Sequence, residues 1–377
     1  MPGLRPDIDP DGLLEYSVVF TDRSLNHMSA AFQGVMHDIH AGLTGVYGAE
    51  RAVVVPGGGS YAMEAVARQF ATDKRVLVIR NGFFSYRWSQ IFEAGRIPAH
   101  ETVMKARRIG EGPTAPFTPA PIDEVVAAIH AERPNVVFAP HVETASGIIL
   151  PDAYVRAVAA AAHDVGALFV LDCVASGCAW VDMAASGVDV LISAPQKGWS
   201  ASPCAGLVML SAAALERCRA AQSSSFAIDL GRWLAIMEAY LNGGHAYHAT
   251  MPTDALRGFR DAMLETQAAG YESLRAAQWD QGNAVRAMLA ARGVQSVAAE
   301  GFGAPGVVVS YTTDPDIQNG RRFLAQGYQI AAGVPLMVDE GADYRSFRLG
   351  LFGLDKLLDV PASLKRLETA FDAVFPA

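Results

Sequence analysis

Short apolar runs that alternate with longer amphipathic stretches constrain the fold of this chain more than any other sequence feature. Runs rich in Val, Ile and Leu are typical of buried strands, whereas the stretches between them are long enough for helices. The expected strands are Val53–Val55, Arg75–Arg80, Asn135–Pro140, Leu168–Asp172, Val188–Ser193 and Leu207–Leu210. The expected helices are Met63–Ala71, Ile122–Ala131, Ala153–Asp164 and Ala212–Ala221. This alternation predicts an α/β fold with a large, mostly parallel, doubly wound sheet.

The pattern changes after about residue 265, where the regular alternation ends. From there we expect a long helix, two strands and a last helix: Tyr271–Arg292, Val307–Tyr311, Ser346–Leu349 and Pro361–Phe375. They predict a smaller C-terminal α+β domain. The predicted organisation is an N-terminal arm over residues 1–20, a large domain over residues 21–265 and a small domain over residues 266–377. The proline-rich stretch Gly112–Pro121 is expected to be a surface connection and not an element.

The composition excludes several classes of protein. Of the 377 residues, 51% are hydrophobic and 18% are charged, which excludes an intrinsically disordered chain and leaves apolar surface for a subunit interface. A formal charge of −9 argues against nucleic acid or anionic lipid as partners. The most apolar region, residues 157–181, contains His163, Asp164 and Asp172, so we expect no membrane span.

Cysteine usage and the chain ends favour a cytoplasmic protein. Cys173, Cys178, Cys204 and Cys218 form no CxxC pair, so we expect small buried hydrophobes, with no disulfide framework and no metal site. The first residues lack a basic segment followed by an apolar stretch, so no secretory signal is expected. The last four residues, Val-Phe-Pro-Ala, carry no retention or peroxisomal tripeptide.

A glycine-rich turn follows the first expected strand. Gly57, Gly58 and Gly59 allow the backbone to approach a ligand without a Cβ clash, and Ser60 is placed to cap the following helix. The free amides of that helix would then face an anion such as a phosphate. The turn matches neither the GxGxxG pattern nor a Walker loop, and an ordinary tight strand–helix turn is an equally good interpretation.

Two charged residues follow neighbouring strands of the expected sheet. Asp172 ends the run Leu168–Asp172, and Lys197 follows the run Val188–Ser193. Because α/β folds bind ligands at the carboxyl ends of parallel strands, both side chains are expected at one ligand-binding edge. The surroundings are poor in charge, so Lys197 would be partly desolvated, which lowers its pKa and makes the amine a better nucleophile. A buried Asp–Lys ion pair with a structural role is the competing interpretation.

Pyridoxal 5′-phosphate would use all three of these features. This cofactor needs a lysine for its Schiff base, a carboxylate that keeps its pyridine nitrogen protonated, and a helix N-terminus for its phosphate. The alternative for the glycine turn is a dinucleotide-binding oxidoreductase, which needs an acidic residue at the end of the next strand. That strand ends at Arg80 and Asn81. The sequence therefore favours pyridoxal phosphate.

With these motifs in place, the chain resembles the class V pyridoxal-phosphate aminotransferases of fold type I. It is most similar to the alanine–glyoxylate and serine–glyoxylate aminotransferases, over about residues 26–358 and with the motifs in family order. The resemblance implies Lys197 and Asp172 as catalytic residues. It implies these cofactor-binding residues: Gly58, Gly59, Ser60, Phe84, Thr144, Asp172, Gln196, Lys197, Tyr247 and Thr250.

The family's pattern implies a separate role for each of the residues outside the glycine turn. Phe84 would stack on the pyridine ring, Thr144 would bond the cofactor's phenolic oxygen, and Gln196 would bond the phosphate. Tyr247 and Thr250 would reach the phosphate held by the other subunit. The resemblance therefore implies a homodimer with shared active sites.

Arg348 resembles the family's arginine that holds the substrate carboxylate, because a planar guanidinium can donate two parallel hydrogen bonds to it. The implied reaction is transamination of a small amino acid, alanine or serine-like, with a small 2-oxo acid such as glyoxylate or pyruvate. A 2-aminoethylphosphonate-type transaminase stays open, since Arg348 could hold a phosphonate, and so does another class V lyase. A thiol-dependent desulfurase is disfavoured because no cysteine follows Cys218. The N-terminal segment departs from the family's Pro-Gly-Pro loop, which leaves both substrates open.

Overall fold

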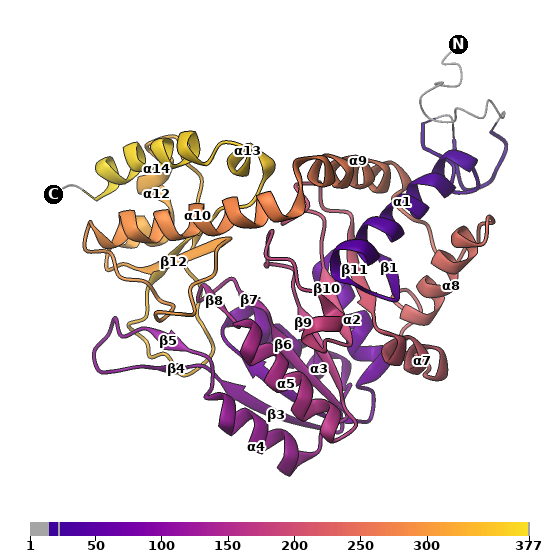
Figure 1. Ribbon diagram of the computed structural model, residues 1–377, viewed down its shortest axis with the longest axis horizontal. Coiled ribbons are helices and arrows are strands. Elements are labelled where there is room, and N and C mark those ends of the chain that lie inside the picture. Colours follow the sequence, from indigo (N-terminus) through magenta and orange to yellow (C-terminus); the bar gives the residue numbers. More distant parts are fainter. Residues whose placement is uncertain (1–14, 22, 376–377) are drawn as a thin grey trace.

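The computed structural model of the chain describes residues 15–21 and 23–375. Most of the predicted N-terminal arm, the predicted absence of a secretory signal and the last two residues lie outside the described residues. Figure 1 shows a large sheet with its helices and, toward the C-terminus, a smaller sheet covered by α10 and α14.

The strands fall into two larger sheets and two short pairs. Their bounds are β1 Arg51–Pro56, β2 Arg75–Arg80, β3 His100–Lys105, β4 Arg107–Arg108, β5 Phe117–Thr118, β6 Val136–Pro140, β7 Val142–Glu143, β8 Ile148–Ile149, β9 Leu168–Asp172, β10 Val190–Ser193, β11 Ala205–Leu210, β12 Val307–Tyr311, β13 Ala331–Ala332 and β14 Ser346–Gly350.

The helices connect and cover these strands. Their bounds are α1 Ala30–Tyr47, α2 Gly59–Phe70, α3 Phe83–Gly95, α4 Ile122–Glu132, α5 Asp152–Asp164, α6 Met183–Ser186, α7 Ala212–Ala220, α8 Leu230–Leu241, α9 Thr253–Ala269, α10 Tyr271–Ala290, α11 Pro315–Gln318, α12 Arg321–Leu324, α13 Leu354–Leu357 and α14 Val360–Val374. None of the helices in the described part of the chain is both long and apolar enough to cross a membrane.

The large sheet confirms the predicted α/β fold. In the described part of the chain it has seven strands in the order β1-β11-β10-β9-β6-β2-β3. The β10–β9, β9–β6, β6–β2 and β2–β3 pairs are parallel, and β11 runs antiparallel to both β1 and β10. The sheet is therefore mostly parallel, and the carboxyl ends of β6, β9 and β10 meet at one edge.

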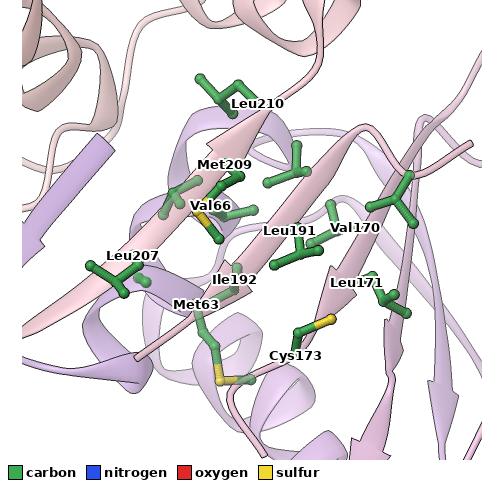
Figure 2. Packing of buried hydrophobic residues seen from close by; sticks show 14 of the residues in the cluster. Met63, Val66, Val170, Leu171, Cys173, Leu191, Ile192, Leu207, Met209 and Leu210 are labelled. Atoms are coloured by element: carbon green, nitrogen blue, oxygen red, sulfur yellow. The ribbon is translucent and has the colours of Figure 1, made fainter. Parts of the chain in front are cut away.

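Apolar packing fixes the helices onto this sheet. Every residue of β9 and β10 is buried, which is expected for strands covered on both faces. Figure 2 shows Met63 and Val66 of α2 among the side chains of β10 and β11, including Ile192. Burial of each large apolar side chain stabilises the folded state by about 1.5–3 kcal/mol. The packing holds the first turn of α2 close to the carboxyl edge of the sheet.

The small sheet has the order β12-β14-β13 and is antiparallel throughout. Its apolar face packs with α10 and α14 in a separate cluster that includes Phe323, Phe347 and Phe371. The predicted strands at Val307–Tyr311 and Ser346–Leu349 are confirmed to within one residue. The predicted domain boundaries stay predictions.

One sequence expectation about the fold is wrong. The stretch Gly112–Pro121 was expected to contain no element, yet Phe117–Thr118 forms β5, which pairs antiparallel with β4. Phe117 is buried, and its amide donates to the carbonyl of Val297 at 2.8 Å. Burial of this aromatic ring against a segment distant in the sequence outweighs the turn preference of the prolines around it.

Candidate active site

The carboxyl ends of β9 and β10 place Asp172 and Lys197 at the same edge of the sheet, as the sequence predicts. Ile192 is the register partner of Asp172, and the turn that carries Lys197 begins directly after β10. The backbone of this turn lies against another loop, because a Cβ at Gly198 would be 2.2 Å from the carbonyl oxygen of Gly177. Glycine after the lysine is therefore required for this packing.

A cavity of about 430 Å³ opens at this edge, within the usual size range of small-molecule sites. It is lined by most of the predicted site residues: Gly59, Ser60, Phe84, Thr144, Asp172, Gln196, Lys197 and Arg348. The same cavity is lined by Arg87 and Phe352, which the sequence reading did not assign. Segments far apart in the sequence thus meet around one space.

Asp172 is a buried carboxyl group that forms no ion pair in the described part of the chain. Burial raises its pKa to about 6, the charge of Glu143 adds to this, and the amide of Val174 and the cation of Arg87 oppose it. The Val174 amide donates to Oδ1 at 2.9 Å. Among the ion pairs of residues 15–21 and 23–375, none joins Asp172 to Lys197. The structural ion pair is therefore not formed, and Asp172 is available to a protonated nitrogen in the cavity.

We expect Asp172→Asn to stabilise the ligand-free protein above pH 6. A pKa raised from 3.8 to about 6 means that folding disfavours the charged form, so stability falls as pH rises between those two values. Ionisation of Asp172 lowers the free energy of unfolding by roughly 3 kcal/mol above pH 6 and by about half of that at pH 5. Denaturant unfolding of both proteins at pH 7.5 and pH 5 measures it. A variant less stable than the parent at both pH values would contradict this account of Asp172.

Lys197 has the properties of a reactive amine. Burial lowers its pKa, and the cation of Arg348 lowers it further. Its Nζ lies 5.3 Å from the centroid of the Phe352 ring. A lowered pKa increases the fraction of neutral amine near pH 7, which is the form that attacks a carbonyl carbon or accepts a proton.

Arg348 enters the cavity from β14 of the small sheet. Its Nε donates to the carbonyl of Ala332 at 2.8 Å, which fixes the plane of the guanidinium. No ion pair within the described chain engages Arg348, and burial lowers its pKa. Its Cζ lies 5.4 Å from the centroid of the Phe84 ring. A half-buried guanidinium with a fixed plane and no ion pair is suited to a carboxylate ligand.

The first turn of α2 forms one wall of the cavity. Gly58 is the N-cap, although it does not itself line the cavity, and the helix begins at Gly59. The prediction that Ser60 caps this helix is wrong, because Ser60 lies inside the first turn and its Oγ accepts from Arg87 Nη1 at 2.8 Å. Glycine at the N-cap leaves the amides without a side-chain acceptor.

Unpartnered amides at this wall fit a phosphate-bearing ligand. The amides of Gly59 and Ser60 have no acceptor within the described part of the chain. These amides, together with the helix N-terminus, would hold the phosphate of pyridoxal 5′-phosphate, while Lys197 and Asp172 would serve its aldehyde carbon and its ring nitrogen. The buried atom of Gln196 without a hydrogen-bond partner is Oε1, which only accepts, so the predicted bond from Gln196 to the phosphate would need its Nε2 and stays a prediction.

Glu143 supports this cavity from behind, and sequence reasoning missed it. Its fully buried carboxylate accepts from the amides of Phe84, Ser85 and Ala145 at 2.8–3.1 Å. It also accepts from the Ser85 hydroxyl at 2.6 Å. The carboxylate thus fixes the N-terminus of α3, which carries Phe84, next to the loop that carries Thr144.

Tyr247 and Thr250 are not part of the cavity of their own chain. Their hydroxyl oxygens lie 3.1 Å apart, and both residues are exposed. His248, between them, bonds the carbonyl of Phe226 at 2.8 Å. The predicted contact of Tyr247 and Thr250 with a second subunit stays a prediction.

The predicted burial of the four cysteines is confirmed. All are free and buried, and burial raises the pKa of Cys178 and Cys218 to about 12 and that of Cys204 to about 11. Burial raises the pKa of Cys173 as well. None of them lines the cavity around Lys197. A thiol nucleophile is thus not part of this site.

Comparison with known proteins extends these findings. A family model described as aminotransferase class-V matches residues 13–297. The sequence is 27% identical over 330 residues to a 2-aminoethylphosphonate–pyruvate transaminase of Paraburkholderia phymatum, covering 85% of this chain and 84% of that protein. It is also 27% identical over 353 residues to a protein of Synechococcus sp. named as the small subunit of a soluble hydrogenase, covering 91% and 86%.

Solved structures share the fold. The crystal structure of an alanine–glyoxylate aminotransferase from Nostoc sp. superposes with a TM-score of 0.78 at 23% identity, covering 92% of this chain and 88% of that chain. At this identity the likeness establishes the fold alone.

Proposed function

The chain belongs to the class V aminotransferases, and on that premise we propose that it transfers an amino group from a small amino acid to a small 2-oxo acid with pyridoxal 5′-phosphate. One observation carries the proposal: Asp172, Lys197 and Arg348 line a single cavity, without an ion pair among them in the described structure. The amino acid is alanine or resembles serine, and the acceptor is a 2-oxo acid such as glyoxylate or pyruvate.

Bound pyridoxal phosphate supplies an electron sink for the electron pair released at the amino acid's Cα. Lys197 Nζ would take the proton from Cα and deliver it to the former aldehyde carbon of the cofactor, two atoms away across the nitrogen, acting first as base and then as acid. The pKa of Lys197, lowered by burial, suits both roles. Asp172 holds the proton on the ring nitrogen, because its negative charge stabilises the positive one in a buried setting.

Arg348 binds the substrate carboxylate in this proposal, and its fixed guanidinium plane orients Cα toward Lys197. The products leave in two half-reactions, of which the second repeats the first in reverse with another 2-oxo acid. The same residues therefore serve both the donor and the acceptor.

We expect Arg348→Ala to raise the KM for L-alanine by about 10- to 100-fold, because the variant loses the charge-assisted hydrogen bonds to the substrate carboxylate. The phosphate of the cofactor should still bind, because Arg348 belongs to β14 and its guanidinium is fixed by the carbonyl of Ala332, not by the first turn of α2. Steady-state kinetics with L-alanine and with a carboxylate-free amine measure the effect. The exposed Arg345, varied to Ala, is the matched control. Equal losses for both substrates would contradict a carboxylate-binding role.

We propose a homodimer in which Tyr247 and Thr250 of one subunit complete the phosphate site of the other. Both hydroxyls are exposed and lie outside the cavity of their own chain, which supports this arrangement. Exposed apolar side chains nearby in sequence or space, including Phe226 and Tyr247 itself, give apolar surface for the contact. The free cysteines support a reducing, cytoplasmic location.

A 2-aminoethylphosphonate donor is the second candidate, because curated relatives are named for it and because the cavity holds two arginines that could bind a phosphonate. A panel of alanine, serine and 2-aminoethylphosphonate, each with glyoxylate and with pyruvate, separates the candidates. The first proposal predicts the highest kcat/KM for alanine or serine. A clear preference for aminoethylphosphonate would replace it with the second candidate.

A further inference from the structure

Arg87 is a cation in the cavity that the proposed reaction does not use. It lies on α3 one turn after Phe84, and its Cζ is 5.2 Å from the centroid of that ring. It is half-buried, and although its charge acts on Asp172, it forms no ion pair with that or any other carboxylate in the described part of the chain. A guanidinium withdrawn from water without a counter-ion is destabilising unless an anion joins it.

The one hydrogen bond of Arg87 points to where that anion would lie. Its Nη1 donates to Ser60 Oγ at 2.8 Å, in the first turn of α2. A hydroxyl has one proton to donate and two lone pairs to accept with. Since Arg87 uses a lone pair of Ser60, the hydroxyl proton stays available to an acceptor in the cavity.

The surroundings of Ser60 supply further donors. The amides of Gly59 and Ser60 have no acceptor in the described part of the chain, and α2 has twelve residues, enough for a helix dipole. Arg348 lies elsewhere, on the small sheet, where Ala332 fixes it. The two arginines of the cavity are thus attached to different walls.

We propose that Arg87 is the cation of the cofactor's phosphate site, binding the phosphate directly and turning the Ser60 hydroxyl toward it. Arg348 then serves the substrate alone. This inference rests on the proposed function, because it assumes that the phosphate belongs to pyridoxal phosphate held at Lys197. It assigns the two arginines to opposite ends of the bound cofactor and substrate.

The test compares two forms of the cofactor that differ only in the phosphate. The ligand-free protein and its Arg87→Gln variant are titrated with pyridoxal 5′-phosphate and with pyridoxal, following absorbance near 400 nm. We expect Arg87→Gln to weaken binding of the phosphorylated form at least about 10-fold and to leave pyridoxal binding within about twofold. Arg345→Gln, which alters an exposed arginine outside the cavity, is the matched control and should change neither affinity by more than about twofold.

Two outcomes would overturn the inference. Equal weakening of both forms would mean that Arg87 only supports the Phe84 ring. Unchanged binding of both forms with a raised substrate KM would assign Arg87 to the substrate. If Arg87→Gln does not fold, Arg87→Lys carries the same comparison: loss confined to the phosphorylated form supports the inference, and equal loss overturns it.

The same titration separates this inference from the proposed function. The proposed function fails if neither pyridoxal 5′-phosphate nor pyridoxal gives an absorbance band with the unaltered protein and borohydride reduction attaches neither of them to Lys197. If the unaltered protein binds both forms at Lys197 but Arg87→Gln shows no phosphate-specific loss, only the role of Arg87 fails.

Discussion

Lys197→Ala is expected to abolish the visible absorbance of the bound cofactor and to lower transamination by at least about 10⁴-fold. Two functions of the Nζ atom are lost together, covalent attachment of the cofactor and transfer of the Cα proton. Other described lysines are placed away from the cavity: Lys74, Lys105, Lys356 and Lys365. The measurement is the absorbance spectrum and the single-turnover rate of each purified protein.

Lys365→Ala is the matched control, because Lys365 is exposed on α14. It should retain both the spectrum and the rate. An external primary amine should restore part of the activity of Lys197→Ala, since a small amine can take over proton transfer in the space left by the side chain. Activity of Lys197→Ala close to that of the parent would remove the lysine from the mechanism.

Asp172→Asn is expected to lower kcat by about 10²–10³-fold while the cofactor stays attached to Lys197. The carboxamide keeps the acceptor for the Val174 amide but lacks the negative charge that holds a proton on the ring nitrogen. Without that charge the ring withdraws electrons less well, so release of the Cα proton is slower. Single-turnover kinetics, together with the absorbance of the bound cofactor, measure the effect.

Asp189→Asn controls for the loss of a buried carboxylate as such. Asp189 accepts from the Phe169 amide and pairs with His163 at 2.9 Å each, and it does not line the cavity. This variant should lose stability but keep its rate per folded molecule. A rate for Asp172→Asn within a few-fold of the parent, with cofactor bound, would show that the charge is not used.

The sequence predicted the elements whose patterns are set locally. The strand Leu168–Asp172 was predicted with the observed bounds, because a short apolar run of this length favours a buried strand over a helix. The strand β3, His100–Lys105, was not predicted, since its residues are polar and only partly buried. It joins the sheet through pairing with β2, and such a tertiary contact leaves no trace in local periodicity.

Some site residues could likewise be predicted from the sequence, and others could not. Asp172 and Lys197 could be predicted because both follow strands that end at one edge. Arg87 could have been found from its spacing of three residues from Phe84, which places both on one face of a helix. The role of Glu143 could not be predicted from the sequence, because it depends on α3 lying against the loop after β6. Ser60 was misassigned as a cap, since the helix begins at Gly59, two residues earlier than a cap at Ser60 would require.

Borohydride reduction of the protein loaded with pyridoxal phosphate, followed by peptide mapping, tests whether Lys197 carries the cofactor. Reduction turns the link between the lysine and the cofactor into a stable bond, so mass spectrometry identifies the lysine that held it. We expect loss of the band near 400 nm and a phosphopyridoxyl group on the peptide that contains Lys197. A label on Lys74, Lys105, Lys356 or Lys365 instead, or no label at all, would contradict it.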